Sequence, residues 1–280
     1  MPPLWRVPRT ACRLLVAAGL LMSLAGPAAA QAPERVRLRW NPPQGVPILV
    51  TTRYSYATLG GMMGWSESIH RLVSGMRVTD GLEVRLLTLD DRAGAGRTEA
   101  EATAAALQLP RGGVDQFEID ATGAWYTAGD DTLGPGRVRA SPLEIALEFP
   151  RVPTVAVGDE WSFSSVVRSG KQVAFLLTRD ATARLESVVS HGGRWIAFVS
   201  VKGTYSWSGK GGFAAAGEER FTQSVLWDLD GEYPIAIRGE SSGFSQPPPT
   251  ASGPVARVEV RSRTQVDFAP EHNPGSTPAP

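Results

Sequence analysis

From residue 34 onward, most of the chain alternates apolar and polar side chains with a period of two. Val36, Leu38 and Trp40 alternate with arginines, and longer runs follow. Successive side chains of a strand point to opposite faces, so this period predicts strands with one buried face. Helical spacing is rare. The sequence therefore predicts a mainly β protein: a curved antiparallel sheet, as a half-barrel or barrel-like meander, with one or two short helices.

Turn residues divide this pattern into individual strands. Asp80-Gly81 predicts a hairpin between residues 66–79 and 82–89, because Asp-Gly tolerates the positive φ of tight turns. Pro42-Pro43 ends a first strand over 36–40, since proline cannot donate to a ladder. The second half predicts a long meander with strands at 161–168, 173–189, 195–207, 213–227, 234–244 and 255–268.

Two segments interrupt the strand pattern. Residues 97–107 are rich in alanine and glutamate, which predicts either a short surface helix or a mobile insertion. Residues 142–149 have apolar side chains at helical spacing, and Pro150 and Pro153 end them.

A weak internal similarity relates the two halves of the expected domain, residues 31–268. Phe117 to Asp120 turns through Gly123, as Val225 to Asp228 turns through Gly231. This pattern is compatible with two similar β halves, about 35–130 and 155–268, and equally with turn chemistry that recurs in any meander. Residues 269–280 are polar and rich in proline and glycine, which predicts a disordered tail.

Residues 1–30 have the three parts of a cleaved signal peptide. Arg6, Arg9 and Arg13 precede an apolar run over 14–25, and alanines at 28–30 provide a cleavage site. Twelve residues span about 18 Å as a helix, well below the ~30 Å hydrocarbon core of a bilayer. We expect an exported, soluble protein, periplasmic or extracellular, without a later membrane span. Cys12 precedes the apolar run, so it is not placed for lipid attachment.

Removing this segment excludes several function classes. Without its three arginines, the 28 basic residues fall to 25 against 28 acidic residues, a net charge of about −3. There is no basic block for nucleic acid. Loss of the single cysteine excludes disulfides, thiol catalysis and thiolate metal sites.

One motif resembles a catalytic site. Gly239-Glu240-Ser241-Ser242-Gly243 matches G-x-S-x-G, the nucleophile elbow of α/β-hydrolases. The elbow requires a helix after it, whereas three prolines follow here, and the nearest downstream histidine is His272 in the expected tail. We interpret the motif as a turn at a strand end and keep a serine hydrolase using Ser241 as the less favoured alternative.

No metal or cofactor site is expected. His70, His191 and His272 have no local ligand spacing, and the sequence after Asp228 and Asp230 lacks the remaining oxygen ligands of a calcium loop. The glycines around Lys210 lack the spacing of a phosphate-binding loop.

Large aromatic side chains are spread over nearly every expected strand. They either fill an ordinary core or line a concave apolar face, which could hold an acyl chain or a partner peptide. The seven tryptophans after residue 30 are Trp40, Trp65, Trp125, Trp161, Trp195, Trp207 and Trp227.

A resemblance rests on Phe149-Pro150, Pro153, Val155, Val157 and Gly158-Asp159-Glu160-Trp161. This segment resembles one that opens the second β half in a family of secreted bacterial proteins of unknown function. In layout, the chain is also similar to lipoprotein-carrier half-barrels, which hold acyl chains. The resemblance implies no catalytic residues. The turn itself is expected to place Trp161 in the core.

Three functional hypotheses follow. The leading one is a non-enzymatic exported protein that binds a lipid or other apolar ligand, or an envelope protein, in its curved sheet. The alternatives are an interaction scaffold of the cell envelope and a serine hydrolase using Ser241.

Overall fold

The structure is a computed structural model of the 280-residue chain. It describes residues 32–78, 81–108, 114–120, 125–127, 154–169, 175–209, 216–246 and 256–271. The chain divides into two units, Met1–Pro33 and Glu34–Pro280, and the description below concerns the second. The expected signal peptide, the expected helix at 142–149 and residues 272–280 lie outside the described residues. Of the expected tail, residues 269–280, Ala269 and Pro270 belong instead to the last strand.

Long strands dominate the second unit, as the period of two predicts. The strands are β1 (Arg35–Val36), β2 (Ile48–Thr58), β3 (Met63–Val78), β4 (Gly81–Gly96), β5 (Leu107–Gln108), β6 (Val114–Asp120), β7 (Trp125–Thr127), β8 (Val155–Ala156), β9 (Glu160–Ser169), β10 (Phe175–His191), β11 (Arg194–Gly209), β12 (Ala216–Asp228), β13 (Tyr233–Gln246) and β14 (Val258–Pro270). One short helix, α2, spans Glu99–Ala104. No helix in the described part of the chain is long and apolar enough to cross a membrane.

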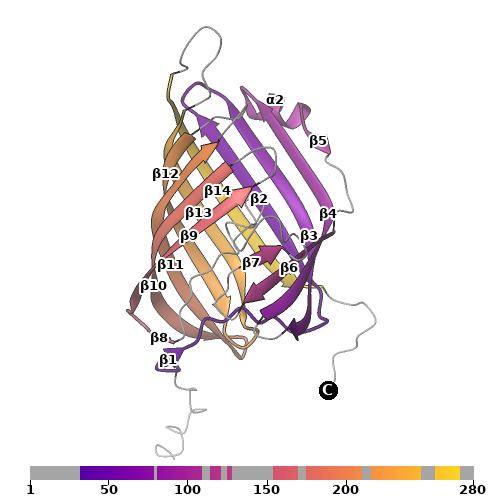
Figure 1. Ribbon diagram of the computed structural model, residues 1–280, viewed down its shortest axis with the longest axis vertical. Coiled ribbons are helices and arrows are strands. Elements are labelled where there is room, and N and C mark those ends of the chain that lie inside the picture. Colours follow the sequence, from indigo (N-terminus) through magenta and orange to yellow (C-terminus); the bar gives the residue numbers. More distant parts are fainter. Residues whose placement is uncertain are drawn as a thin grey trace, which may run out of the picture. The chain divides into compact units, whose positions relative to one another are not determined.

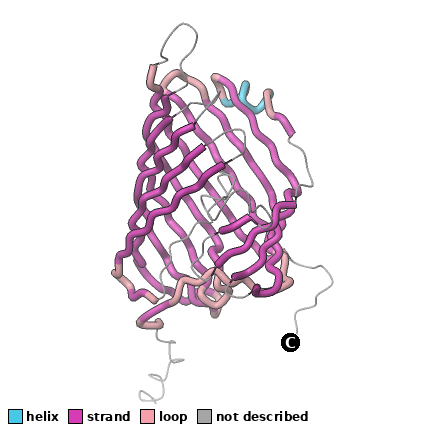
Figure 2. Tube along the Cα trace, viewed as in Figure 1, coloured by secondary structure: helices cyan, strands magenta, loops and turns pink. Residues whose placement is uncertain are grey.

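Twelve of these strands form one curved antiparallel sheet (Figures 1 and 2). Its order is β7-β6-β4-β3-β2-β14-β13-β12-β11-β10-β9, with β5 paired to β4. The last strand pairs with the first long one, so β14 beside β2 joins the two halves of the chain. Among the described strands, β7 and β9 each pair on one side only. The sheet is therefore a half-barrel that does not close within the described residues.

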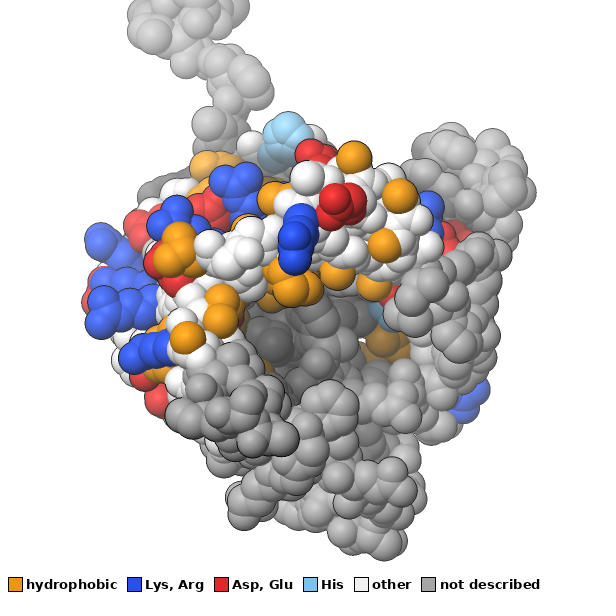
Figure 3. All heavy atoms as spheres, turned by 90° about the horizontal axis from the view of Figure 1, so that it is seen from above, with side chains coloured by type: hydrophobic (Ala, Val, Ile, Leu, Met, Phe, Trp, Pro, Cys, Tyr) orange, Lys and Arg blue, Asp and Glu red, His pale blue; other side chains and the backbone are white. Residues whose placement is uncertain are grey.

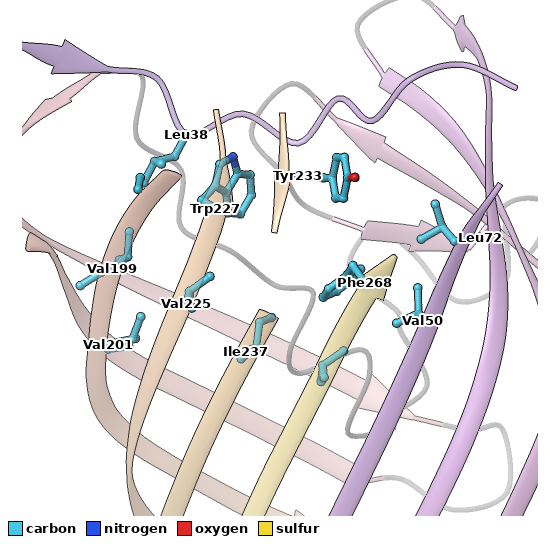
Figure 4. Close-up of a cluster of buried hydrophobic side chains, with 14 of the residues drawn as sticks. Leu38, Val50, Leu72, Val199, Val201, Val225, Trp227, Tyr233, Ile237 and Phe268 are labelled. Atoms are coloured by element: carbon cyan, nitrogen blue, oxygen red, sulfur yellow. The ribbon is translucent and has the colours of Figure 1, made fainter. Parts of the chain in front are cut away.

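Alternation gives the sheet a buried and an exposed face. The apolar part of the buried face gathers side chains from eight neighbouring strands, β10 to β4, and Figure 4 shows some of them. The segment that precedes β2 crosses the apolar face where β12 and β14 end. There the Trp40 ring meets the rings of Trp227 and Phe268 edge-on, with centroid distances of 6.3 and 6.0 Å. The Asn41 amide also donates to the Glu232 carbonyl at 2.8 Å. This end of the buried face is consequently packed and covered.

The mainly β fold, the hairpin of β3 and β4 and the six-strand meander from β9 to β14 are confirmed. The predicted first strand is wrong beyond Val36, because β1 ends there and, among the described strands, pairs only with β8. Leu38 and Trp40 instead pack against the core from an irregular segment. Gly158 lies in a turn with a positive φ of 93°, and the partly buried Trp161 packs against the core as expected.

Candidate functional site

Ser241 lies in the middle of β13, so both interpretations of its motif, a nucleophile elbow and a turn at a strand end, are wrong. It pairs with Phe221 of β12 on one side and Ser262 of β14 on the other. A nucleophile elbow instead presents its serine at a sharp strand-to-helix turn, with backbone N–H groups free for an oxyanion. His70 belongs to β3, and β14 and β2 lie between that strand and β13. The geometry does not support a hydrolytic centre.

Ser241 is instead part of a hydroxyl-rich group around a carboxylate, which we call the Glu219 cluster: Tyr54, Glu219, Ser241 and Ser262. The Ser241 hydroxyl donates to Glu219 Oε2 and lies 2.5 Å from Ser262 Oγ. Ser262 also interacts with Glu219 and with the Tyr54 hydroxyl. All four belong to the buried face, yet only Ser262 is buried, and the other three are half-buried.

Burial alters the acid–base properties of the Glu219 cluster. Desolvation raises the pKa of Glu219 above its ordinary value, and the hydrogen bonds from Ser241 and Ser262 oppose this rise without cancelling it. Desolvation also raises the pKa of Tyr54, against a hydrogen bond with Ser262. The carboxyl group is therefore easier to protonate than one in water.

Beside this cluster, a buried arginine is enclosed by aromatic rings. Arg179 Nη2 donates to Gln223 Oε1 at 2.8 Å, and Gln223 Nε2 donates to the Tyr205 hydroxyl at 3.2 Å. The guanidinium carbon lies 5.0 Å from the ring centroids of both Phe163 and Phe221. Arg179 is only 3% exposed, so it stabilises the inside of the sheet and does not present its charge to a ligand.

The exposed face carries a groove of about 950 Å³. Cross-strand pairs place Arg220, Ser242 and Arg261 in one row. A parallel row runs from Thr222 through Glu240, Arg263 and Ser55 to Trp65. Helix α2 forms one end of the groove and packs over Gly94 and Gly96, where a Cβ would collide with α2 at Ala102. The groove is thus a mixed surface, in which apolar side chains such as Met63 and Trp65 lie beside polar and charged ones.

The remaining sequence candidates have structural roles where they are described. Asp228 Oδ1 accepts from the Asp230 and Gly231 amides at 3.1 and 2.9 Å, which makes a hydrogen-bonded turn. His70 Nδ1 lies 3.2 Å from Thr88 Oγ1, and His191 is exposed at the end of β10. The described residues contain no group of three metal-ligating side chains. His272 and Lys210 lie outside them.

No protein-family model matches the chain, and no curated protein matches it. Solved structures with some likeness include an outer membrane channel from Pseudomonas putida F1, with 11% identity, 82% of this chain and 97% of that chain covered, and a TM-score of 0.22. A Vibrio parahaemolyticus domain described as an outer membrane lipoprotein-sorting protein has 10% identity, coverage of 83% and 88%, and a TM-score of 0.20. OmpF of Salmonella typhi in complex with daunomycin has 8% identity, coverage of 80% and 97%, and a TM-score of 0.20. Scores this low do not establish a common fold.

Sequence reasoning singled out Ser241 but missed its partners Glu219, Ser262 and Tyr54. These residues belong to three other strands and come together only through strand pairing. One signal was present: Glu219 occupies an inward position in the alternation of β12, where Phe221, Val225 and Trp227 are buried. A carboxylate at an inward position of a strand is unusual.

Proposed function

We propose that this is an exported, non-enzymatic binding protein that holds an amphiphilic ligand against the polar part of its buried face. The observation that supports this is the division of that face. At one end apolar side chains are packed and covered, whereas Tyr54, Glu219 and Ser241 remain half-buried. Seen from the end that carries α2, apolar side chains of the described residues border a hollow (Figure 3).

In a protein that served only as a packed scaffold, these polar groups would reduce the stability of the sheet. Taking a hydroxyl out of water without a partner costs about 1–3 kcal/mol, and a carboxylate costs more. Apolar side chains would stabilise the sheet better at these positions. Polar groups that stay partly accessible beside Phe221 fit a ligand with both apolar and polar parts.

The test compares two neighbouring serines of β13. We expect native mass spectrometry of protein purified from its own host to show a bound small molecule. Ser241→Trp should abolish it by filling the buried face, whereas Ser242→Trp, at the next and exposed position, should retain it. Circular dichroism checks that both variants fold. Wild-type protein without a ligand, or equal occupancy in both variants, would contradict the proposal.

The groove on the exposed face favours a second candidate, an interaction scaffold. Arg261 pairs with Glu259 at 3.2 Å and Arg263 with Glu240 at 3.0 Å. Arg220, by contrast, has no ion pair among the described residues, so it is available to a partner's carboxylate. A pull-down from envelope extracts should recover a partner that Arg220→Glu releases; recovery unaffected by that change would reject the groove as the interface.

A further inference from the structure

We propose that the ligand presents a cationic amine, and that Glu219 is the counter-ion that receives it beside the rings of Tyr54 and Tyr56. This inference rests on the proposed function, because it assigns a chemical class to a ligand on the buried face. It differs from an acyl-chain site, which needs no charge.

Strand geometry fixes where the carboxylate lies. Glu219 is directly opposite Gly243 on β13. Because glycine has no side chain, no side chain fills the space beside Glu219 on that strand. The carboxylate instead reaches the neighbouring row, where Ser241 and Ser262 hydrogen-bond to it. Both serines are themselves cross-strand partners, so the acceptor is held in position before any ligand arrives.

No described residue neutralises the negative charge of the Glu219 carboxylate. Glu219 forms no ion pair with any described arginine or lysine, and its hydrogen-bond partners are neutral hydroxyls. The buried-face arginine nearest in the fold, Arg179, lies two strands away on β10 and is engaged by Gln223 and its aromatic neighbours. A half-buried carboxylate in such surroundings favours an incoming cation, because serine hydroxyls only partly replace the lost water.

Aromatic rings next to the carboxylate favour an organic cation. The Tyr54 and Tyr56 ring centroids are 6.1 Å apart, and Tyr56 lies opposite Ser262. An ammonium group can donate hydrogen bonds to the carboxylate and to serine oxygens while its positive charge faces a ring. A metal ion is disfavoured, since the described residues offer no group of three suitable ligands.

The experiment uses three probes that share one chain and differ in head group: octylamine, octanol and octanoate. Their affinities for the full mature protein are measured by isothermal titration calorimetry at pH 7. We expect octylamine to bind at least tenfold more tightly than octanol, and octanoate to bind most weakly. Glu219→Gln should remove the advantage of octylamine and leave the octanol affinity unchanged. Glu240→Gln, on the next strand but exposed, is the matched control and should behave as wild type.

The outcomes separate the two proposals. Octanol and octylamine binding with equal affinity would overturn the cationic ligand while leaving the binding function intact. An octylamine advantage that survives Glu219→Gln would likewise overturn the role of Glu219. Failure of all three probes to bind, together with absence of a co-purifying molecule, would overturn both proposals.

Discussion

At the scale of single residues, one carboxylate organises the turn between β12 and β13. The Asp228 side chain is 0% exposed and accepts from Arg194 Nη1 at 2.7 Å as well as from two turn amides. The two turn amides and the half-exposed Arg194 guanidinium would lose this buried acceptor if the carboxylate were removed, and hydrogen bonds to a charged group contribute about 1.5–3 kcal/mol each. The aspartate noted in the sequence as a possible calcium ligand is thus a structural residue.

Replacing this carboxylate should be costly. We expect Asp228→Ala to lower the free energy of unfolding by about 3 kcal/mol, and Asp228→Asn by about 1 kcal/mol because an amide oxygen can still accept from the turn. Urea unfolding followed by tryptophan fluorescence measures both. Glu240→Gln, which breaks only an exposed ion pair, should change the value by under about 1 kcal/mol. Equal effects of all three changes would contradict this role.

Glu219 should make stability depend on pH. Its pKa is raised in the folded state above the ordinary value of 4.5, so the folded protein binds the proton more tightly than the unfolded chain. The contribution of Glu219 to stability is therefore fully present below pH 4.5 and is lost as pH rises through the raised pKa. We expect Glu219→Gln to raise the Tm at pH 7.5 and to have a smaller effect at pH 4. A wild-type protein more stable than the variant at pH 7.5 would show that the hydrogen bonds outweigh desolvation.

At the scale of elements, α2 shows how glycine spacing creates a docking site. Thr98 caps the helix by accepting from the Glu101 amide at 3.1 Å, and the buried Ala102 faces β4. The sequence offered a helix or a mobile insertion for this segment, and the helix is confirmed. The alanines of α2 have small side chains, and Gly94 and Gly96 compensate by letting the backbones approach closely.

Filling this space should detach the helix without unfolding the sheet. We expect Gly94→Val to displace α2, because the new Cβ would meet the Ala102 carbonyl oxygen. Amide hydrogen exchange in residues 99–104 should rise, while exchange in the β10 to β13 ladder stays slow. Gly60→Val is the control, since Gly60 is exposed and a Cβ there would make only an ordinary contact with Thr58. Unchanged protection of α2 in Gly94→Val would refute the docking geometry.

At the scale of the whole molecule, the pairing of β14 with β2 makes the sheet continuous. The pairing runs from Val260 beside Thr58 to Pro270 beside Ile48, and Arg71 of β3 binds Glu271 just beyond it, with Nη2 and Oε1 2.6 Å apart. Both strands of this pair also contribute side chains to the core, since Val50 of β2 and Val266 of β14 are fully buried. Stability of either half should therefore depend on the other.

Removing the last strand should abolish cooperative folding. We expect a chain ending at residue 257 to lose its single thermal unfolding transition and to bind a hydrophobic dye, because the buried edges of β2 and β13 lose their partner. A chain ending at Glu271 retains β14 and should unfold like the full protein. An unchanged transition in the shorter chain would mean that the halves fold independently.

Local sequence alone determined the strands and most turns of this protein. The period of two, Asp-Gly and paired glycines act within a few residues, so they predict β3 to β4 and β9 to β14 without knowledge of distant contacts. The G-x-S-x-G motif gave a wrong prediction because its role depends on the strands that lie beside it, which a local pattern does not show. Only the tertiary structure decided that Ser241 is a mid-strand residue beside Glu219 and Ser262, because cross-strand partners are set by register between segments far apart in the chain. The same register determined which part of the buried face is packed and which part keeps its polar groups accessible.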